Sequence, residues 1–215
     1  MKDWYYAVDG VQYGPVTVEY LRMLLAEKRI EREDLVWNES MPEWRAASSM
    51  TELVGGATPL FAISNVKLAL MMISTFSVYQ IFWCFKHWKA IRVRTGEDMM
   101  PLARGIFALF FFHLLAREVN ESATAHAVDR KLPVALLTTL FVILMLAQRL
   151  PDPFWLICFL VVVPMMLLQS VANRVNHKAA PLADRNGRIR GWNWLAVLVG
   201  IPLFILAIIG TFMPE

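Results

Sequence analysis

Apolar and polar residues alternate in two different ways along this chain, and the change falls near Gly55. Before it, residues 4–8 and 35–37 are short stretches rich in aromatic and β-branched side chains, which predict strands. Between them, residues 19–27 have apolar side chains at helical spacing and follow Thr17, a residue type that begins helices. The pattern predicts a compact α+β unit of about fifty residues, whose large aromatic side chains supply much of its small core.

After Gly55 the chain consists mainly of long apolar runs. These are residues 68–85, 105–116, 133–148, 153–170 and 192–212. A helix needs roughly 17–25 residues to cross the hydrocarbon of a bilayer, and four of the runs are close to this length or longer. The run at 105–116 is about twelve residues long, and it crosses only if Arg104 reaches back to the headgroups. The sequence therefore predicts an all-α transmembrane bundle of four or five spans after the small α+β domain.

Composition and charge separate the same two regions. The chain is 57% hydrophobic with a mean hydropathy of +0.47, above the roughly 45–50% apolar content of soluble domains. Residues 1–58 contain six Lys or Arg against ten Asp or Glu, a net charge of −4, so the formal +3 of the chain leaves +7 for the remainder. We therefore expect domains at residues 1–55 and 65–215, joined by a linker at residues 56–64.

The distribution of basic residues predicts the orientation in the membrane. The connection at residues 173–191 carries five basic residues against Asp184 alone, and the positive-inside rule places it in the cytoplasm. No apolar stretch of signal-peptide length precedes residue 61, so the N-terminal domain is also expected inside. If the run at 105–116 crosses, the four basic residues between 86 and 94 face outward, as an exception to the rule. Alternatively that run does not cross, or the first two runs form a helical pair that dips into the membrane from the cytoplasmic side.

The apolar runs lack the groups that intramembrane chemistry needs. Residues 133–148, 153–170 and 192–212 contain no Asp, Glu, Lys, Arg or His, which argues against proton-coupled transport and metal-dependent proteolysis. Cys84 and Cys158 lie in apolar runs, and the chain has no phosphate-binding loop, nucleophile elbow or metal-ligand spacing. We therefore expect no enzymatic activity, no cofactor and no metal.

Polar side chains near the runs suggest contacts rather than chemistry. Gln169, Asn173 and Asn176 share one helix face, where their amides are expected to form hydrogen bonds between helices. A polar pocket at the membrane surface is the alternative. The basic segments 86–104 and 174–190 can attract anionic lipid headgroups, and they are too sparse to predict nucleic-acid binding.

A pattern of aromatic, glycine and aliphatic positions covers the first quarter of the chain. It consists of Trp4-Tyr5-Tyr6, Gly10, Gln12, Gly14-Pro15, Leu21, Leu24, Ile30, Leu35-Val36-Trp37, Met41 and Trp44. The pattern resembles the bacterial GYF-like family, GYF domain 2, which is similar to the eukaryotic GYF adaptors whose aromatic surface binds proline-rich peptides. The resemblance implies peptide binding. Where the eukaryotic hallmark places a tryptophan after the helix methionine and then Gly-Tyr-Phe, this chain reads Met23-Leu24-Leu25-Ala26 and then Lys28-Arg29-Ile30.

Aromatic side chains are the candidate peptide-binding groups. A polyproline helix is already stiff, so it docks into an aromatic groove with little loss of entropy. The candidate groove residues are Trp4, Tyr6, Tyr13 and Trp37. The alternative is that these rings fill the core of a small domain, which is also the expected role of Trp44. The acidic charge of the domain favours peptides that carry Lys or Arg near their prolines.

The sequence thus predicts a multi-pass protein of the bacterial inner membrane, whose cytoplasmic GYF-like domain binds a peptide of a partner protein, proline-rich or not. Membrane lipid is a further expected partner, and a second copy of the chain is another candidate. The residues from Thr75 to Trp83 also resemble uncharacterised bacterial membrane proteins, a likeness that names no activity. The alternative function is a small transporter, channel or transport accessory that the GYF-like domain regulates.

Overall fold

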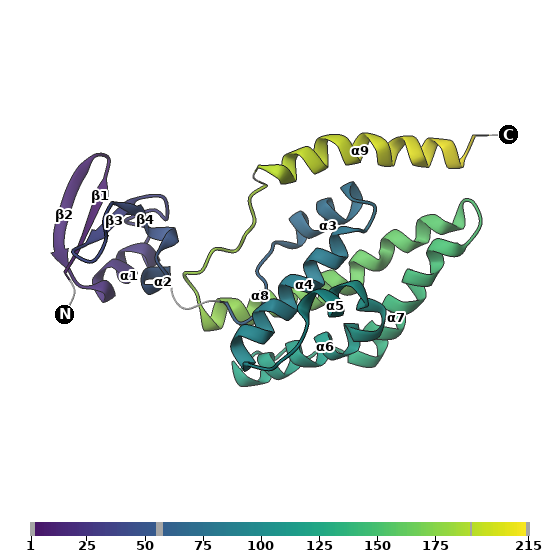
Figure 1. Cartoon of the computed structure of the whole chain (residues 1–215), viewed down its shortest axis with the longest axis horizontal. Coiled ribbons are helices and arrows are strands. Elements are labelled where there is room, and N and C mark those ends of the chain that lie inside the picture. Colours follow the sequence, from purple (N-terminus) through teal and green to yellow (C-terminus); the bar gives the residue numbers. More distant parts are fainter. Residues whose placement is uncertain (1–2, 55–57, 190, 214–215) are drawn as a thin grey trace. The chain divides into compact units, whose positions relative to one another are not determined.

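The computed structural model describes residues 3–54, 58–189 and 191–213 (Figure 1). The chain forms two compact units, one of Met1–Thr58 with Asn176–Asp184 and the other of Pro59–Val175 with Arg185–Glu215. Residue 55 of the predicted first domain, residues 56 and 57 of the predicted linker, and Arg190 of the basic connection lie outside the described residues. Each unit has its own hydrophobic core.

A four-stranded antiparallel sheet and a helix form most of the first unit. The strands are β1 (Trp4–Val8), β2 (Val11–Val16), β3 (Leu35–Asn38) and β4 (Arg45–Ala46), in the order β2-β1-β3-β4. Helix α1 (Val18–Ala26) follows β2, and the 3-10 turn η1 (Ala47–Ser49) and the short α2 (Thr51–Val54) follow β4. This small antiparallel sheet with its helix confirms the predicted α+β domain.

Local chemistry fixes the start of α1 and directs its apolar side chains inward. The Thr17 side chain accepts a hydrogen bond from the backbone N–H of Tyr20 at 3.2 Å, which satisfies one free donor at the helix N-terminus. Leu182, from the second segment of the unit, packs against the core. The core itself consists of Trp4, Leu21, Leu24, Leu25, Ile30, Val36, Ala47 and Leu53.

The second unit is helical. Its elements are α3 (Asn65–Ser74), α4 (Tyr79–Thr95), α5 (Pro101–Ile106), α6 (Ala108–Ala125), α7 (Val134–Leu146), the 3-10 segments η2 (Ala147–Arg149) and η3 (Phe154–Val161), α8 (Val162–Ala179) and α9 (Trp192–Thr211). The segments α7 and η3 pack together around the turn at Pro151. Gly200 of α9 lies so close to α3 that a Cβ would overlap the Ser74 carbonyl, and the two helices lie side by side (Figure 1).

The prediction of four or five membrane-spanning helices is wrong. Among the described residues, two helical stretches are long and apolar enough to cross a bilayer, Phe154–Ala179 and Asn193–Thr211. The run at 133–148 forms a shorter apolar helical stretch, Val134–Arg149. The remaining two runs are broken by turns of the backbone.

These turns lie at Phe76 and Phe107. Phe76 and Ser77 have positive φ angles of 49° and 67°, so the run at 68–85 breaks between α3 and α4 instead of continuing as one helix. The Thr75 side chain accepts a hydrogen bond from the backbone N–H of Tyr79 at 2.9 Å at the start of α4. The run at 105–116 breaks at Phe107, where α5 ends and α6 begins. Average hydropathy does not reveal such breaks, because it contains no information on backbone turns.

Candidate functional site

One face of the sheet carries three half-buried aromatic side chains. Side chains alternate along a strand, and because Trp4 and Val36 lie in the core, Tyr5 and Trp37 lie on the opposite face. Tyr5 and Trp37 pair across β1 and β3, with ring centroids 5.7 Å apart. Trp44, just before β4, stacks on Trp37 with centroids 6.2 Å apart. We call these three residues, Tyr5, Trp37 and Trp44, the aromatic face.

A hydrogen-bonded turn holds the tryptophans of the aromatic face. The Trp37 indole Nε1 donates to the Met41 carbonyl at 2.9 Å, and the Met41 N–H donates to the Asn38 carbonyl at 2.9 Å. The Oδ1 atom of the buried Asn38 accepts from the backbone N–H and the hydroxyl of Ser40 at 2.9 and 2.6 Å. Because these bonds order the loop between β3 and β4, the loop presents Trp44 to Trp37 before any ligand binds.

Gly14 supports the same face from β2. A Cβ at Gly14 would lie 2.7 Å from the Trp4 carbonyl oxygen and 2.8 Å from the Cδ1 atom of Tyr5, closer than such atoms can approach. The residue also has a φ of +130°, which L side chains rarely adopt. Glycine therefore lets β2 approach Tyr5 without displacing its ring.

The structure separates the four residues that the sequence predicts as one groove. Trp4 is 2% exposed and lies in the core. Tyr6 stacks on Tyr13 with ring centroids 5.1 Å apart, on the same face of the sheet as Trp4, and Tyr13 is 46% exposed. Trp37 lies on the opposite face. The structure therefore brings Tyr6 to Tyr13, and it brings Trp37 to two rings, Tyr5 and Trp44, that the predicted groove leaves out.

Exposed acidic residues lie in the loop that leads to the aromatic face. Glu43 pairs with Arg45 at 3.5 Å, with side chains 70% and 50% exposed, so water screens the pair and it contributes little to stability. Glu39 is also exposed. Together with the net charge of −4 over residues 1–58, these side chains give the face an acidic environment that attracts cationic groups.

The second unit contains a buried polar cluster between α4 and α8. Gln169 Oε1 accepts a hydrogen bond from the Trp83 indole at 2.7 Å and lies 3.0 Å from His87 Nε2. Gln169 Nε2 donates to the Phe61 carbonyl at 3.0 Å and to Asn173 Oδ1 at 2.8 Å. We call Trp83, His87, Gln169 and Asn173 the buried amide cluster. Its bonds between helices confirm the expected interhelical role of Gln169.

The cluster determines the protonation state of His87. Because Gln169 Oε1 only accepts hydrogen bonds, the imidazole Nε2 carries the hydrogen and Nδ1 is left as an acceptor. Within the described part of the chain, this Nδ1 is buried without a hydrogen-bond partner. Burial disfavours the imidazolium and lowers the pKa of His87 to about 4, although the hydrogen bond to Gln169 acts in the opposite direction. At neutral pH His87 is therefore an uncharged hydrogen-bond donor to α8.

The metal-ligating side chains of the described residues do not form a metal site. Within residues 3–54, 58–189 and 191–213, no three His, Cys, Asp or Glu side chains come together as a metal-binding group. Cys84 is buried, Cys158 is half-buried, and both are free thiols.

Comparison with known proteins identifies one family. The family described as GYF domain 2 matches residues 4–53, which run from the start of β1 into α2. These residues form a GYF-like module, and GYF domains are peptide-binding domains. The match confirms the resemblance for this part of the chain. No curated protein and no solved structure matches the chain.

Proposed function

We propose that this protein is a membrane-anchored binding protein whose GYF-like module captures a peptide segment of a partner protein. The observation that carries the proposal is the aromatic face, Tyr5, Trp37 and Trp44, in the segment that matches the GYF family. Residues 1–55 act as the binding module on the cytoplasmic side, and residues 65–215 anchor it in a bacterial inner membrane. The protein acts by binding, without catalysis and without a cofactor.

The aromatic face suits a proline-rich ligand. A polyproline helix has three residues per turn and no internal hydrogen bonds, and it is stiff before it binds, so little entropy is lost. Ring centroids 5.7 and 6.2 Å apart offer adjoining flat surfaces on which a proline ring can stack. The exposed Glu39 and Glu43 attract Lys or Arg near the prolines. The proposed ligand is therefore a proline-rich segment with flanking basic residues.

Exposed apolar surface supports the anchoring. Asn193–Thr211 is 19 residues long with a mean hydropathy of 2.4, and 6% of its most apolar window is buried inside the protein. A core helix of a soluble protein with this composition would be mostly buried. The exposed side chains of α9 include Leu198, Leu203 and Leu206, and covering them with lipid removes apolar surface from water. Phe154–Ala179, with a mean hydropathy of 2.3, is the second stretch of sufficient length.

Peptide binding by the full chain in lipid nanodiscs tests the proposal. Fluorescence anisotropy compares a labelled proline-rich peptide carrying Lys or Arg with the same peptide in which Ala replaces each Pro. We expect Trp37→Ala to weaken binding of the proline-rich peptide by roughly 30-fold, the effect of losing a central aromatic contact. Tyr13→Ala removes an exposed ring from the other face of the sheet and should change the affinity by less than about twofold.

Circular dichroism separates loss of binding from loss of folding in these variants. If folded Trp37→Ala binds the peptide as well as the wild type does, the aromatic face is not the site. If Tyr13→Ala loses binding instead, the site is the Tyr6–Tyr13 stack. Solute flux through the chain in liposomes that survives deletion of residues 1–55, without peptide binding, would favour the transport alternative.

A further inference from the structure

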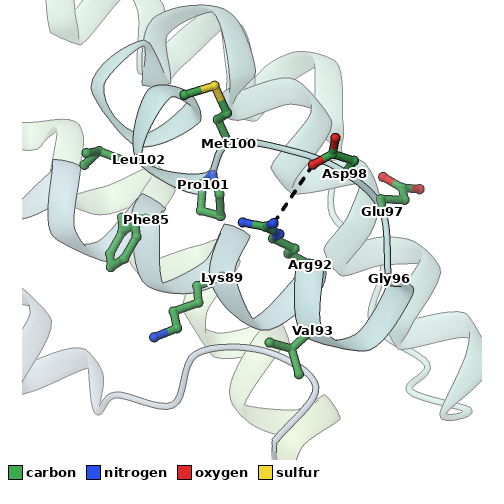
Figure 2. A pocket seen from close by; sticks show the side chains of 10 residues that line it. All are labelled: Phe85, Lys89, Arg92, Val93, Gly96, Glu97, Asp98, Met100, Pro101 and Leu102. Atoms are coloured by element: carbon green, nitrogen blue, oxygen red, sulfur yellow. Dashed lines mark ion pairs between the residues drawn. The ribbon is translucent and has the colours of Figure 1, made fainter.

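A cavity of about 640 Å³ lies where α4, α5 and the loop between them meet (Figure 2). Helix α4 contributes Phe85, Lys89, Arg92 and Val93, and the loop and the first turn of α5 contribute the other walls, including Met100 and Leu102. Its volume is within the roughly 300–1,000 Å³ of small-molecule sites. The cavity contains no residue of the aromatic face or the buried amide cluster, so neither of those sites explains it.

One end of the cavity continues into an exposed apolar strip. Helices α4 and α5 approach closely at Gly105, where a Cβ would lie 2.9 Å from the Ile81 carbonyl oxygen and 3.1 Å from the Phe85 backbone nitrogen. Ile81 is one helical turn before Phe85, and Ile106 is one turn after Leu102, so both extend the apolar wall beyond the cavity. Leu102 and Ile106 are 56% and 54% exposed. The strip is therefore open to an apolar chain.

Beside this strip, the α4 wall of the cavity carries two basic side chains, Lys89 and Arg92, and the loop at the far end carries Glu97 and Asp98 (Figure 2). Helix α4 carries four Lys or Arg and no Asp or Glu. Lys89 is exposed, and Figure 2 shows it on the same helix as Arg92, with the Arg92–Asp98 ion pair drawn between helix and loop. That pair is 4.0 Å long and the Asp98 side chain is fully exposed, so water screens it and Arg92 is available to another anion.

We propose that this cavity binds one anionic phospholipid, with the phosphate at Lys89 and Arg92 and an acyl chain along the apolar strip. Two cations on the α4 wall, next to exposed apolar side chains, match the headgroup and the acyl chain of such an amphiphile. The carboxylates of Glu97 and Asp98 also line the cavity and repel additional negative charge. The fitting headgroup therefore carries a single phosphodiester, as phosphatidylglycerol does. The inference rests on the proposed membrane anchoring, because the membrane supplies the lipid.

Native mass spectrometry of the full chain released from detergent micelles measures this binding. The protein is titrated with phosphatidylglycerol or with phosphatidylcholine that carries the same acyl chains. We expect the wild type to bind phosphatidylglycerol about tenfold more tightly or better, because each cation near a lipid surface contributes about fivefold. The double variant Lys89→Gln with Arg92→Gln should lose this preference, and the charge-conserving Lys89→Arg with Arg92→Lys should keep it.

Two further variants test whether the preference depends on the position of the cations rather than on overall charge, and whether binding needs the apolar strip. Arg130→Gln with Lys131→Gln removes the same charge from an exposed loop of the same unit and should keep the preference for phosphatidylglycerol. Leu102→Gln with Ile106→Gln should weaken the binding of both lipids. Equal affinity of the wild type for the two lipids, or an equal loss in the loop variant, would overturn the proposed site.

Measurements on the same preparation keep this inference apart from the proposed function. A chain that does not enter nanodiscs contradicts the anchoring and with it the lipid site. A chain that enters nanodiscs and binds the proline-rich peptide, but shows no preference for phosphatidylglycerol, contradicts the lipid site alone.

Discussion

The two units of this protein each have an apolar core, but they differ in the polar side chains that they bury and in the apolar side chains that they expose. In the GYF-like unit the core is made of apolar residues such as Trp4 and Val36, and charged residues lie at the surface. In the helical unit, Gln169 and His87 are fully buried, whereas α9 exposes many large apolar side chains. What differs between the two units is the medium that their exposed apolar surface requires. Water around the GYF-like unit and lipid around the helical unit would produce this contrast.

Replacing Gln169 should have the largest effect, because this residue is the centre of the buried amide cluster. Gln169→Leu leaves the Trp83 indole, the His87 imidazole and the Phe61 carbonyl without their common partner. Each buried polar group without a partner costs about 1–3 kcal/mol, so for three such groups we expect a loss of at least about 3 kcal/mol in the free energy of unfolding. Thermal unfolding in detergent measures the loss. Gln148→Leu changes an exposed amide of the same unit and is the control; an equal effect there would contradict the role of the cluster.

Trp4 provides the corresponding test in the GYF-like unit. Trp4→Ala removes a side chain that is 2% exposed, and we expect a loss of about 3–5 kcal/mol, which is large for a unit of this size. Trp37→Ala should cost clearly less, because Trp37 is half-buried on the aromatic face. Urea titration followed by limited proteolysis of residues 1–58 in the full chain compares the two. A cost at Trp37 as large as that at Trp4 would make the aromatic face part of the core.

Acid should destabilise the helical unit through His87. The folded pKa of about 4 lies below the ordinary 6.5, so the unfolded state binds more protons between these pH values. The stability that depends on neutral His87 is complete above pH 6.5 and is lost as the pH falls towards 4, by up to about 3 kcal/mol. The measurement is Tm from pH 8 to pH 4 for the wild type and for His87→Gln, whose side chain does not titrate. Identical pH profiles would exclude His87 as the cause.

The smallest effect is expected at the break between α3 and α4. The Thr75 hydroxyl donates to the Met71 carbonyl at 2.7 Å and accepts from the Tyr79 N–H at 2.9 Å. Thr75→Val keeps the shape of the side chain and removes both bonds, so we expect a loss of about 1 kcal/mol. Thr124→Val, whose hydroxyl donates to the Asn120 carbonyl at an exposed position, should cost less than about 0.5 kcal/mol. Comparison of the two Tm values in detergent tests whether Thr75 orders the turn.

The sequence predicts β1, α1 and β3 of the first unit because their signals are local, and it predicts neither β2 nor β4. The expected helix at residues 19–27 is shifted by one residue from α1 (Val18–Ala26), and the first expected strand coincides with β1. The spans are predicted poorly, because the residues that break them are themselves compatible with an apolar run. Phe76 counts as apolar in any average, yet its positive φ ends a possible span.

The aromatic site was predictable only in part. The sequence identifies the aromatic residues of the first unit, and strand alternation alone separates Trp4 from Tyr5. The pairing of β1 with β3 is a contact between distant parts of the sequence, and it decides that Trp37 joins Tyr5. The contact of Trp44 with Trp37 depends on side-chain hydrogen bonds in the loop after Asn38. The periodicity of the sequence does not reveal these bonds.

Gly14 offers a way to study the protein in living cells. Any side chain at this position would press on the Tyr5 ring and the Trp4 carbonyl, and its φ of +130° already disfavours other residues. A Gly14→Ala allele would therefore distort the aromatic face and leave every residue from 65 to 215 unchanged. In a strain with this allele, the helical unit would be unchanged, and the proposed peptide binding would be lost. The phenotype of the strain would therefore report on peptide binding alone.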